Sequence, residues 1–410
     1  MSVRIFILFF GLFFPLFPTI LPGTSGLQLI FLALSCMTLA LFFNIKKVNK
    51  NVAFTFFLLS LLMLIITSIS IFFDLVSGVF ISSDLFELPR LTFISLTFFV
   101  FFAFDTNDKV IFRIVRFFKW TFLIFVLYSF FEVFVSLFKS IAFFLYKREG
   151  KEIIGNKAVG SFGITYHFAY FLLIPVFWSF FNFLRERKLI NVIVFLICLV
   201  ALLLTQSRTL FITALIGFFI IPIIPFKYKS SILKGYFVLL VSVVPILFFV
   251  FFLYWEAIIT AFSYIYSGLS GLIENGVDMS GNGQGSANVR FAQLLWVYNN
   301  QFDFPLIGAG IGKGEVVLES VYALYYYRYG LIGICVFAYL ITLSVSTTKY
   351  LMNNDFEILA PFYFSFMMFY LLSPIALLSS ASQDSTRLML VFYGCLGVFV
   401  SRKLLLKSQR

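Results

Sequence analysis

The sequence has little charge. Asp, Glu, Lys and Arg make up 12% of its residues, whereas 61% are hydrophobic and 62 of the 410 are phenylalanine. Such a chain lacks the polar surface of a water-soluble domain. Apolar runs of about 20 residues recur along it, each long enough to cross a bilayer as a helix. These runs do not alternate polar with apolar residues, which excludes the strands of a membrane barrel. We predict an all-α, polytopic integral membrane protein.

Residues that build metal and cofactor sites are also scarce. His167 is the one histidine, and all four cysteines lie inside apolar runs, so we expect neither disulfides nor a metal site. The Gly-rich stretch "GNGQGS" (281–286) is neither a P-loop nor a dinucleotide fingerprint, because no Lys-Ser/Thr pair follows it and no strand precedes it. We therefore expect no cofactor.

The apolar runs predict about twelve transmembrane helices. Their expected ranges are 3–22, 27–44, 52–73, 91–104, 118–138, 164–184, 190–204, 209–226, 235–255, 320–345, 359–379 and 388–402. Lysine and arginine collect in connections such as 46–50 and 185–188 and in the tail 402–410, which the positive-inside rule assigns to the cytoplasm. The net charge of +12 therefore indicates topology rather than a nucleic-acid partner, and both termini are expected to be cytoplasmic.

Two enlarged outer loops interrupt what is otherwise a single membrane domain over 1–410. The predicted loops cover 139–163 and 256–319. Long connections of this kind are uncommon unless they are functional or disordered. The second loop contains a predicted helix at 288–301, where Phe291, Leu294, Leu295 and Tyr298 share one face. We expect this amphipathic helix to lie on the outer membrane surface.

Several charged residues stand where charge is costly. Arg208 lies in a short turn between two apolar runs, where it either binds an anion or snorkels from a helix end. Arg290 begins the surface helix, either as an anion ligand or as a solvated charge. Arg328 is on the opposite face of its helix from Glu319 and should point into the bundle, either toward an anion or in a structural ion pair.

The predicted topology brings these polar residues to one side. Those that map to the outer leaflet or just above it are Lys157, His167, Arg208, Arg290, Glu319 and Arg328. Cations at such a surface suit an anionic lipid head such as a diphosphate. Aromatic residues near the outer loops, Trp296 and Tyr322 among them, suit either sugar stacking or the interfacial aromatic belt. A lone histidine such as His167 is more often a hydrogen-bonded structural residue than a ligand.

The motifs follow one another in a distinctive order. "KAVGSFGITYHFA" (157–169) precedes the turn with Arg208, and "PLIGAGIG" (305–312) precedes a helix that contains "GLIG" (330–333). Over about 155–335 this order resembles the O-antigen polymerase and O-antigen ligase superfamily of bacterial envelope glycosyltransferases, which implies a GT-C-like helical fold. The first motif of that family often begins with an arginine, where this chain has Lys157. It also often has Asn-Pro-Asn before its histidine, where this chain has "ITY". The positions that match its first motif are Gly160, Phe162, Gly163, His167 and Ala169.

One position separates the two branches of this superfamily. The ligases carry a functional histidine in the pattern His-[Asn/Ser/Gln], nine residues, then Gly-x-x-Gly. Here Glu319 and Ser320 precede nine residues and then Gly330 and Gly333, so the frame is kept but glutamate replaces histidine. The resemblance therefore favours the Wzy-type polymerase branch.

The resemblance implies an enzyme that polymerises undecaprenyl-diphosphate-linked oligosaccharide repeat units into O-antigen or capsular polysaccharide. The reaction takes place at the periplasmic face of the bacterial inner membrane, and a chain-length regulator protein is an expected partner. Arg208 and Arg290 are expected to stabilise the departing diphosphate without a metal ion, with Lys157 and Arg328 in support. Glu319 is either the general base or a helix cap.

Other functions stay open at this point. An O-antigen ligase would transfer finished glycan to lipid A-core, and the missing histidine counts against it. A flippase of the lipid-linked unit would need its polar residues in a central cavity that is reachable from both sides, whereas here they map outward. A structural membrane protein without chemistry would not need the cations.

Overall fold

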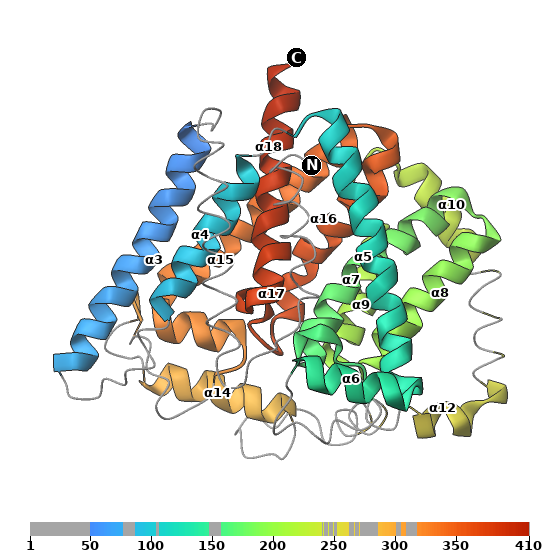
Figure 1. Cartoon of the computed structure of the whole chain (residues 1–410), viewed down its shortest axis with the longest axis horizontal. Helices are drawn as coiled ribbons and strands as arrows, with labels where there is room; N and C mark the ends of the chain where they lie inside the picture. Colours follow the sequence, from blue (N-terminus) through green and yellow to red (C-terminus); the bar gives the residue numbers. More distant parts are fainter. Residues whose placement is uncertain are drawn as a thin grey trace. The chain divides into compact units, whose positions relative to one another are not determined.

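The computed structural model describes most of the chain. The described residues are 50–76, 87–103, 106–146, 157–239, 252–261, 286–300, 305–308 and 318–409, with the single positions 241, 245, 249, 266 and 270. The predicted spans 3–22 and 27–44, and part of 235–255, lie outside them. Within the described part, the regular elements are all helices and no strand occurs (Figure 1). The prediction of an all-α chain is confirmed.

Several described helices are suited to a membrane. Five of the described helices are long and apolar enough to cross a membrane: Phe54–Phe73, Thr165–Glu186, Val321–Asn354, Glu357–Ala376 and Arg387–Ser408. A sixth would be the bent pair Asp108–Phe134 and Ser136–Ala142, if it is one span. Shorter apolar helices are Leu91–Phe102, Leu189–Leu204 and Arg208–Ile220. These helices are consistent with a multi-pass membrane protein, and the total of twelve spans stays a prediction.

The described residues form two compact units. The first unit takes its residues from Met1–Ile114, Val277–Thr347 and Leu377–Arg410, and the second from Val115–Gly276 and Thr348–Ala376.

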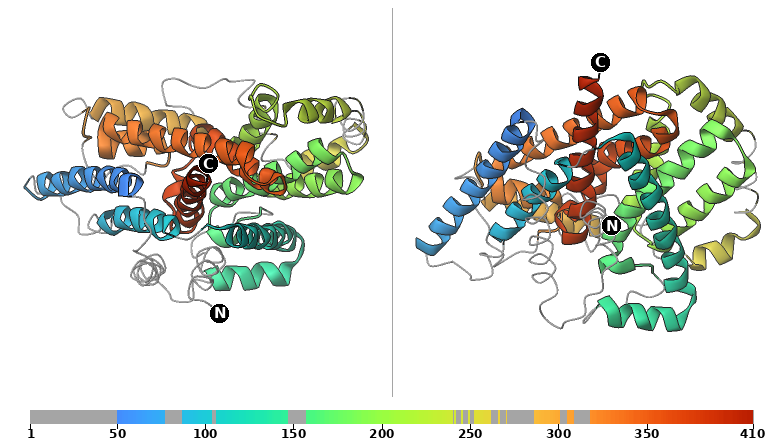
Figure 2. Two further views of the ribbon diagram at one scale, coloured as in Figure 1. Left: turned by 90° about the horizontal axis from the view of Figure 1, so that it is seen from above. Right: turned by 45° about the horizontal axis from the view of Figure 1, so that its top comes forward.

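Three helices of the first unit pack through aromatic rings and glycine. They are α3 (Lys50–Val76), α4 (Glu87–Phe102) and α18 (Cys395–Ser408), and α4 contacts both of the others (Figures 1 and 2). Phe56 and Phe98 stack with ring centroids 3.7 Å apart. A Cβ at Gly397 would lie 2.5 Å from the carbonyl oxygen of Phe98, so only glycine permits this approach of α18 to α4.

A break divides the long helix α15 (Val321–Asn354) in the part of it that belongs to the first unit. Gly330 has φ 61° and ψ −155°, which no helix contains. The N–H groups that lose helical partners there are satisfied by a separate segment: Leu331 donates to the Pro305 carbonyl at 3.0 Å and Ile332 to the Leu306 carbonyl at 3.3 Å. The predicted continuous span 320–345 is therefore kinked. The reason is that two glycine motifs, "PLIG" and "GLIG", meet backbone to backbone.

Replacing Gly330 by alanine is expected to destabilise the protein strongly. Its backbone conformation is nearly exclusive to glycine, at a cost of about 1–3 kcal/mol for other residues, and the added Cβ would lie 2.4 Å from the Leu306 carbonyl carbon. Thermal unfolding in detergent measures the effect. Gly163→Ala is the control, because Gly163 also has positive φ (74°) but open space around it. Equal melting temperatures for the two variants would contradict the importance of the backbone contact.

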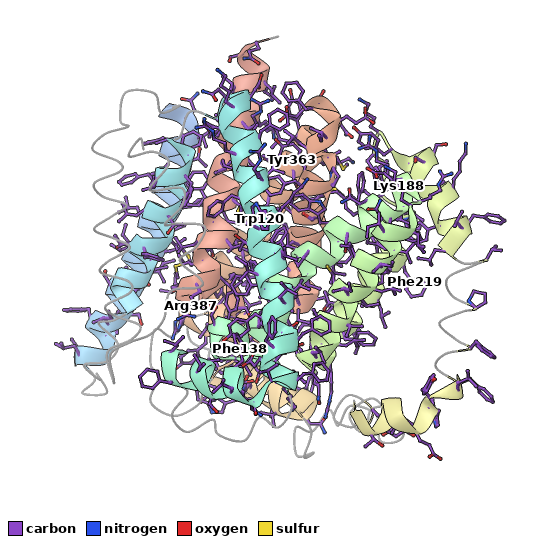
Figure 3. All side chains as sticks on the ribbon, turned by 45° about the vertical axis from the view of Figure 1, so that its right-hand side comes forward. Trp120, Phe138, Lys188, Phe219, Tyr363 and Arg387 are labelled. Atoms are coloured by element: carbon purple, nitrogen blue, oxygen red, sulfur yellow. The ribbon has the colours of Figure 1, made fainter. Side chains whose placement is uncertain are left out.

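Helix α7 (Thr165–Glu186) is the centre of the second unit. It packs against α8 (Leu189–Leu204), α9 (Arg208–Ile220), α10 (Lys229–Val238) and α16 (Ala360–Ala376). The rings of Phe181 and Phe364 join α7 to α16 at a centroid distance of 4.6 Å. Trp120 of α5 and Phe219 of α9 are instead exposed, as Figure 3 shows.

The second unit also contains a sharp bend. Helix α5 (Asp108–Phe134) meets α6 (Ser136–Tyr146) at 114° (Figure 1). The predicted span 118–138 thus ends at Phe134, and the predicted loop 139–163 begins as helix. The apolar residues Leu137, Ile141 and Phe144 of α6 recur at helical spacing and are exposed, which explains why this segment is a helix rather than a loop. A further short helix, α12 (Trp255–Ala261), belongs to the same unit.

Candidate functional site

The residues predicted to form one site fall into both units. Lys157, His167 and Arg208 belong to the second unit. Those of the first unit are Arg290, Trp296, Glu319, Tyr322 and Arg328.

Arg208 is the first residue of α9, immediately after a tight turn. Gln206 has φ 52°, a left-handed conformation that reverses the chain after α8. The Thr205 hydroxyl donates to the Leu202 carbonyl at 2.7 Å and accepts the N–H of Ser207 at 3.3 Å. These bonds fix the turn, and the half-buried Arg208 side chain begins at a backbone position that cannot drift.

Lys157 is brought to the same turn. The N–H of Ala158 donates to the Leu204 carbonyl at 2.8 Å, which holds the segment before α7 against the end of α8. Burial lowers the pKa of the Lys157 ammonium from its ordinary value, and the nearby charge of Arg208 lowers it further. The second unit therefore holds two cations close enough to repel each other, which favours the binding of an anion with more than one charge.

Glu132 of α5 organises this segment, and the sequence analysis missed it. Its carboxylate is almost completely buried, and Oε2 accepts the N–H groups of Val159 at 2.9 Å and Gly160 at 2.7 Å. Bonds from N–H groups to a carboxylate are among the stronger hydrogen bonds in proteins. A glutamate near the end of an apolar run was the available sign, because buried acidic residues in membrane helices are costly and usually have a role.

The glycines of the first motif shape the entry into α7. Gly160 has φ 61°, and a Cβ there would lie 2.7 Å from the ring of Phe168. The short helical turn Gly160–Phe162 and Gly163, with φ 74°, then lead into α7, where His167 lies half-buried in the first turn. Lys157 precedes this turn in the sequence, and His167 follows it.

Arg290 and Glu319 form an ion pair in the first unit. The Arg290 Nη2 donates to Glu319 Oε2 at 3.2 Å, and its Nε donates to the Ser379 carbonyl at 2.9 Å. The N–H of Glu319 donates to Gln293 Oε1 at 3.1 Å. The arginine side chain is 14% exposed and the glutamate side chain 38%, so the carboxylate is the more accessible partner.

The helix that carries Arg290 turns a polar residue toward the protein. Helix α14 (Ser286–Asn300) occupies the range predicted at 288–301, but its buried residues are Gln293 and Val297, while Tyr298 is exposed. The bonds of Arg290 and Gln293 to Glu319 and Ser379 explain this orientation. Hydropathy alone could not predict which face of α14 packs against the protein. Its apolar side chains are equally well accommodated by lipid, so their pattern does not identify the protein-facing side. Attachment to a membrane surface stays a prediction.

The other predicted residues of the first unit lie along α14 and α15. Trp296 packs on Tyr327 with ring centroids 5.4 Å apart, and Tyr322 meets Phe337 edge to face at 6.4 Å. Arg328 is buried, close to the break at Gly330.

A segment between α16 and α17 (Thr386–Met389) holds the ion pair in place, and the sequence analysis did not identify it. We call residues 377–385 the polar strap. The Leu377 carbonyl accepts the N–H of Val321 at 3.1 Å, and the N–H of Ala381 donates to the Glu319 carbonyl at 2.7 Å. The Asp384 carboxylate accepts the Tyr325 hydroxyl at 2.9 Å. The serine-rich composition "SSASQDS" (379–385) was a visible sign, but it is also typical of an ordinary connection.

No protein-family model and no curated protein matches this chain. The two sets of residues must therefore be judged by their own chemistry. The second unit offers two neighbouring cations, Lys157 and Arg208. The first unit offers an accessible carboxylate, Glu319, whose backbone and side chain are both held by neighbours. Among the described residues, no group of three or more His, Cys, Asp or Glu side chains could hold a metal ion.

Proposed function

We propose that the chain is a glycosyltransferase that polymerises undecaprenyl-diphosphate-linked oligosaccharide repeat units at the periplasmic face of a bacterial inner membrane. The observation that carries the proposal is the neighbouring pair of cations Lys157 and Arg208, held beside the α8–α9 turn. An arginine and a lysine together suit a diphosphate, which the arginine binds through two donors and the lysine as a point charge.

The proposed reaction joins two lipid-linked units. A hydroxyl oxygen of one unit bonds to the anomeric carbon of the growing chain, while the bond from that carbon to the diphosphate oxygen breaks. Undecaprenyl diphosphate leaves with the electron pair, and its negative charge is stabilised by Arg208 and Lys157. The hydroxyl proton passes to a general base, and Glu319 is the candidate for that base that the sequence offers.

The ion pair changes the role we assign to Arg290. Its guanidinium already faces the Glu319 carboxylate and the Ser379 carbonyl. We therefore assign Arg290 to positioning Glu319 and leave the diphosphate to the cations of the second unit. His167, Trp296, Tyr322 and Arg328 remain proposed contacts of the substrate.

The glycan ladder of a deletion strain tests the function. A polymerase predicts that cells without the protein carry a single repeat unit on lipid A-core, and that the ladder returns with the wild-type gene. Polymer that forms but stays off lipid A would instead identify a ligase. Loss of every repeat unit from the cell surface would identify a flippase.

The pKa of Lys157 predicts how activity depends on pH. Because this pKa is lowered by burial and by Arg208, the ammonium loses its proton at a lower pH than an ordinary lysine does. We expect kcat/KM for polymer formation to fall as the pH rises through the lowered pKa, since the neutral amine no longer attracts the diphosphate. In Lys157→Arg the charge persists to higher pH, so the alkaline fall should shift upward. If kcat/KM falls at the same alkaline pH in the wild type and in Lys157→Arg, Lys157 does not bind the diphosphate.

A further inference from the structure

The polar strap contains buried groups without a hydrogen-bond partner of normal geometry. Gln383 is fully buried, and neither its Nε2 nor its Oε1 has a hydrogen-bond partner of normal geometry. The hydroxyl oxygens of Ser320 and Ser385 are buried without partners as well. An unsatisfied amide or hydroxyl in the interior costs about 1–3 kcal/mol, and native structures retain few of them. Three such side chains in one segment and the helix start beside it therefore require a reason.

These side chains belong to one place in the first unit. The strap runs along the start of α15, joined through Val321 to Leu377 and through Tyr325 to Asp384. The Gln383 amide lies next to the Tyr325 hydroxyl, although that hydroxyl donates to Asp384. Ser385 occupies the N-cap position of α17, yet its hydroxyl makes no capping bond. A serine at this position usually caps the helix, so this hydroxyl is left for another use.

The chemistry of the unsatisfied groups selects the ligand. Gln383 offers both a donor and an acceptor, and each serine hydroxyl can act as either. A diphosphate has acceptors only and cannot satisfy the amide oxygen, whereas the hydroxyl groups of a neutral sugar donate and accept. Beside the amide, the ring of Tyr325 packs edge to face on that of Tyr329, with centroids 5.5 Å apart. A saccharide fits these groups better than an anion does.

The same strap also holds the proposed general base. Ala381 binds the Glu319 carbonyl, and Ser379 binds the Arg290 side chain that pairs with the Glu319 carboxylate. We infer that Gln383, with Ser320 and Ser385, binds hydroxyl groups of the acceptor saccharide beside Glu319, an assignment that rests on the proposed function. Ser380, Ala381 and Asp384 of the strap are partly exposed, so the strap lies at the surface of the described residues.

The Gln383→Met variant tests the site. Methionine keeps the length of the side chain but removes both polar groups. The probe is the free oligosaccharide released by mild acid from the lipid-linked repeat units of the producing cells, titrated calorimetrically into the full chain in nanodiscs. We expect about tenfold weaker binding in Gln383→Met, the loss of about one to two hydrogen bonds. Its melting temperature should equal or exceed that of the wild type, because an unsatisfied amide is removed.

A control variant separates this site from its surroundings. Thr97→Val removes another buried polar group of the same unit, whose hydroxyl donates to the Phe93 carbonyl within α4, and should leave binding unchanged. Wild-type affinity in Gln383→Met, absence of binding to the wild type, or a lowered melting temperature in Gln383→Met would each overturn the inference.

The outcomes also distinguish the site from the proposed function. Binding that depends on Gln383 supports the saccharide site even if the same preparation makes no polymer from lipid-linked units, a result that would count against the polymerase proposal. Polymer formation together with unchanged binding in Gln383→Met would overturn the saccharide site alone.

Discussion

Polymer formation is expected to fall by about 100-fold or more when Arg208 is replaced by alanine, because one cation that stabilises the leaving diphosphate is lost. Arg208 begins α9 directly after a hydrogen-bonded turn, so the start of its side chain is anchored before substrate binds. Lys157 alone cannot compensate, since its own proton is lost more readily than that of an ordinary lysine. The measurement is the rate of polymer formation from purified lipid-linked units.

Two further variants make the Arg208 result specific. Arg208→Lys keeps the charge but not the forked donor geometry, and should retain intermediate activity. Arg116→Ala removes an exposed arginine of α5 in the same unit and should behave as the wild type. Full-length polymer at the normal rate from Arg208→Ala would remove Arg208 from the chemistry. Equal losses in Arg208→Ala and Arg116→Ala would show a general effect of net charge.

Glu319→Gln is expected to lower the rate of polymer formation by about 100-fold, the typical contribution of a general base. Glutamine retains an oxygen that can accept the Arg290 hydrogen bond, and the backbone bonds to Gln293 and Ala381 are untouched. The variant therefore removes the proton acceptor while the local structure is kept. Near-normal chains would show that Glu319 serves structure rather than chemistry. Glu357→Gln, which changes an exposed glutamate of the second unit, should have no effect.

Arg290→Ala completes this test from the other side of the ion pair. The protein should still insert and fold, but polymer should be lost because Glu319 is no longer held by the guanidinium. If the two residues act as one unit, the double variant should be no slower than the slower single variant. If the losses of rate in the two single variants add up in the double variant, Arg290 does not act by positioning Glu319. Arg290 would then again be assigned to binding the diphosphate.

The helical class and several of the membrane helices could be predicted from hydropathy alone. The ranges 52–73, 164–184 and 359–379 correspond closely to α3, α7 and Glu357–Ala376. These stretches have no stable alternative in lipid, because a helix satisfies its own backbone. The bend between α5 and α6 and the break at Gly330 were not foreseen. Both depend on contacts that hydropathy does not report.

The candidate site was predicted in part. Arg290 and Glu319 were each selected from the sequence, and the structure pairs them across 3.2 Å. Lys157 and Arg208 were also selected, and their charges interact in the second unit. Glu132 and Gln383 were missed, because each acts through partners far away in the sequence or through the lack of a partner.

The sequence by itself determined that this protein is helical and apolar, with costly charges at a small number of positions. These properties follow from the free energy of transferring each side chain from water to the bilayer, which depends little on its neighbours in the fold. Only the tertiary structure decided which face of α14 turns inward, which carboxylate holds the segment before α7, and which buried groups of the strap stay unsatisfied. Hydrogen bonds and ion pairs depend on the distance and angle between two particular groups, and those are set only when the chain has folded.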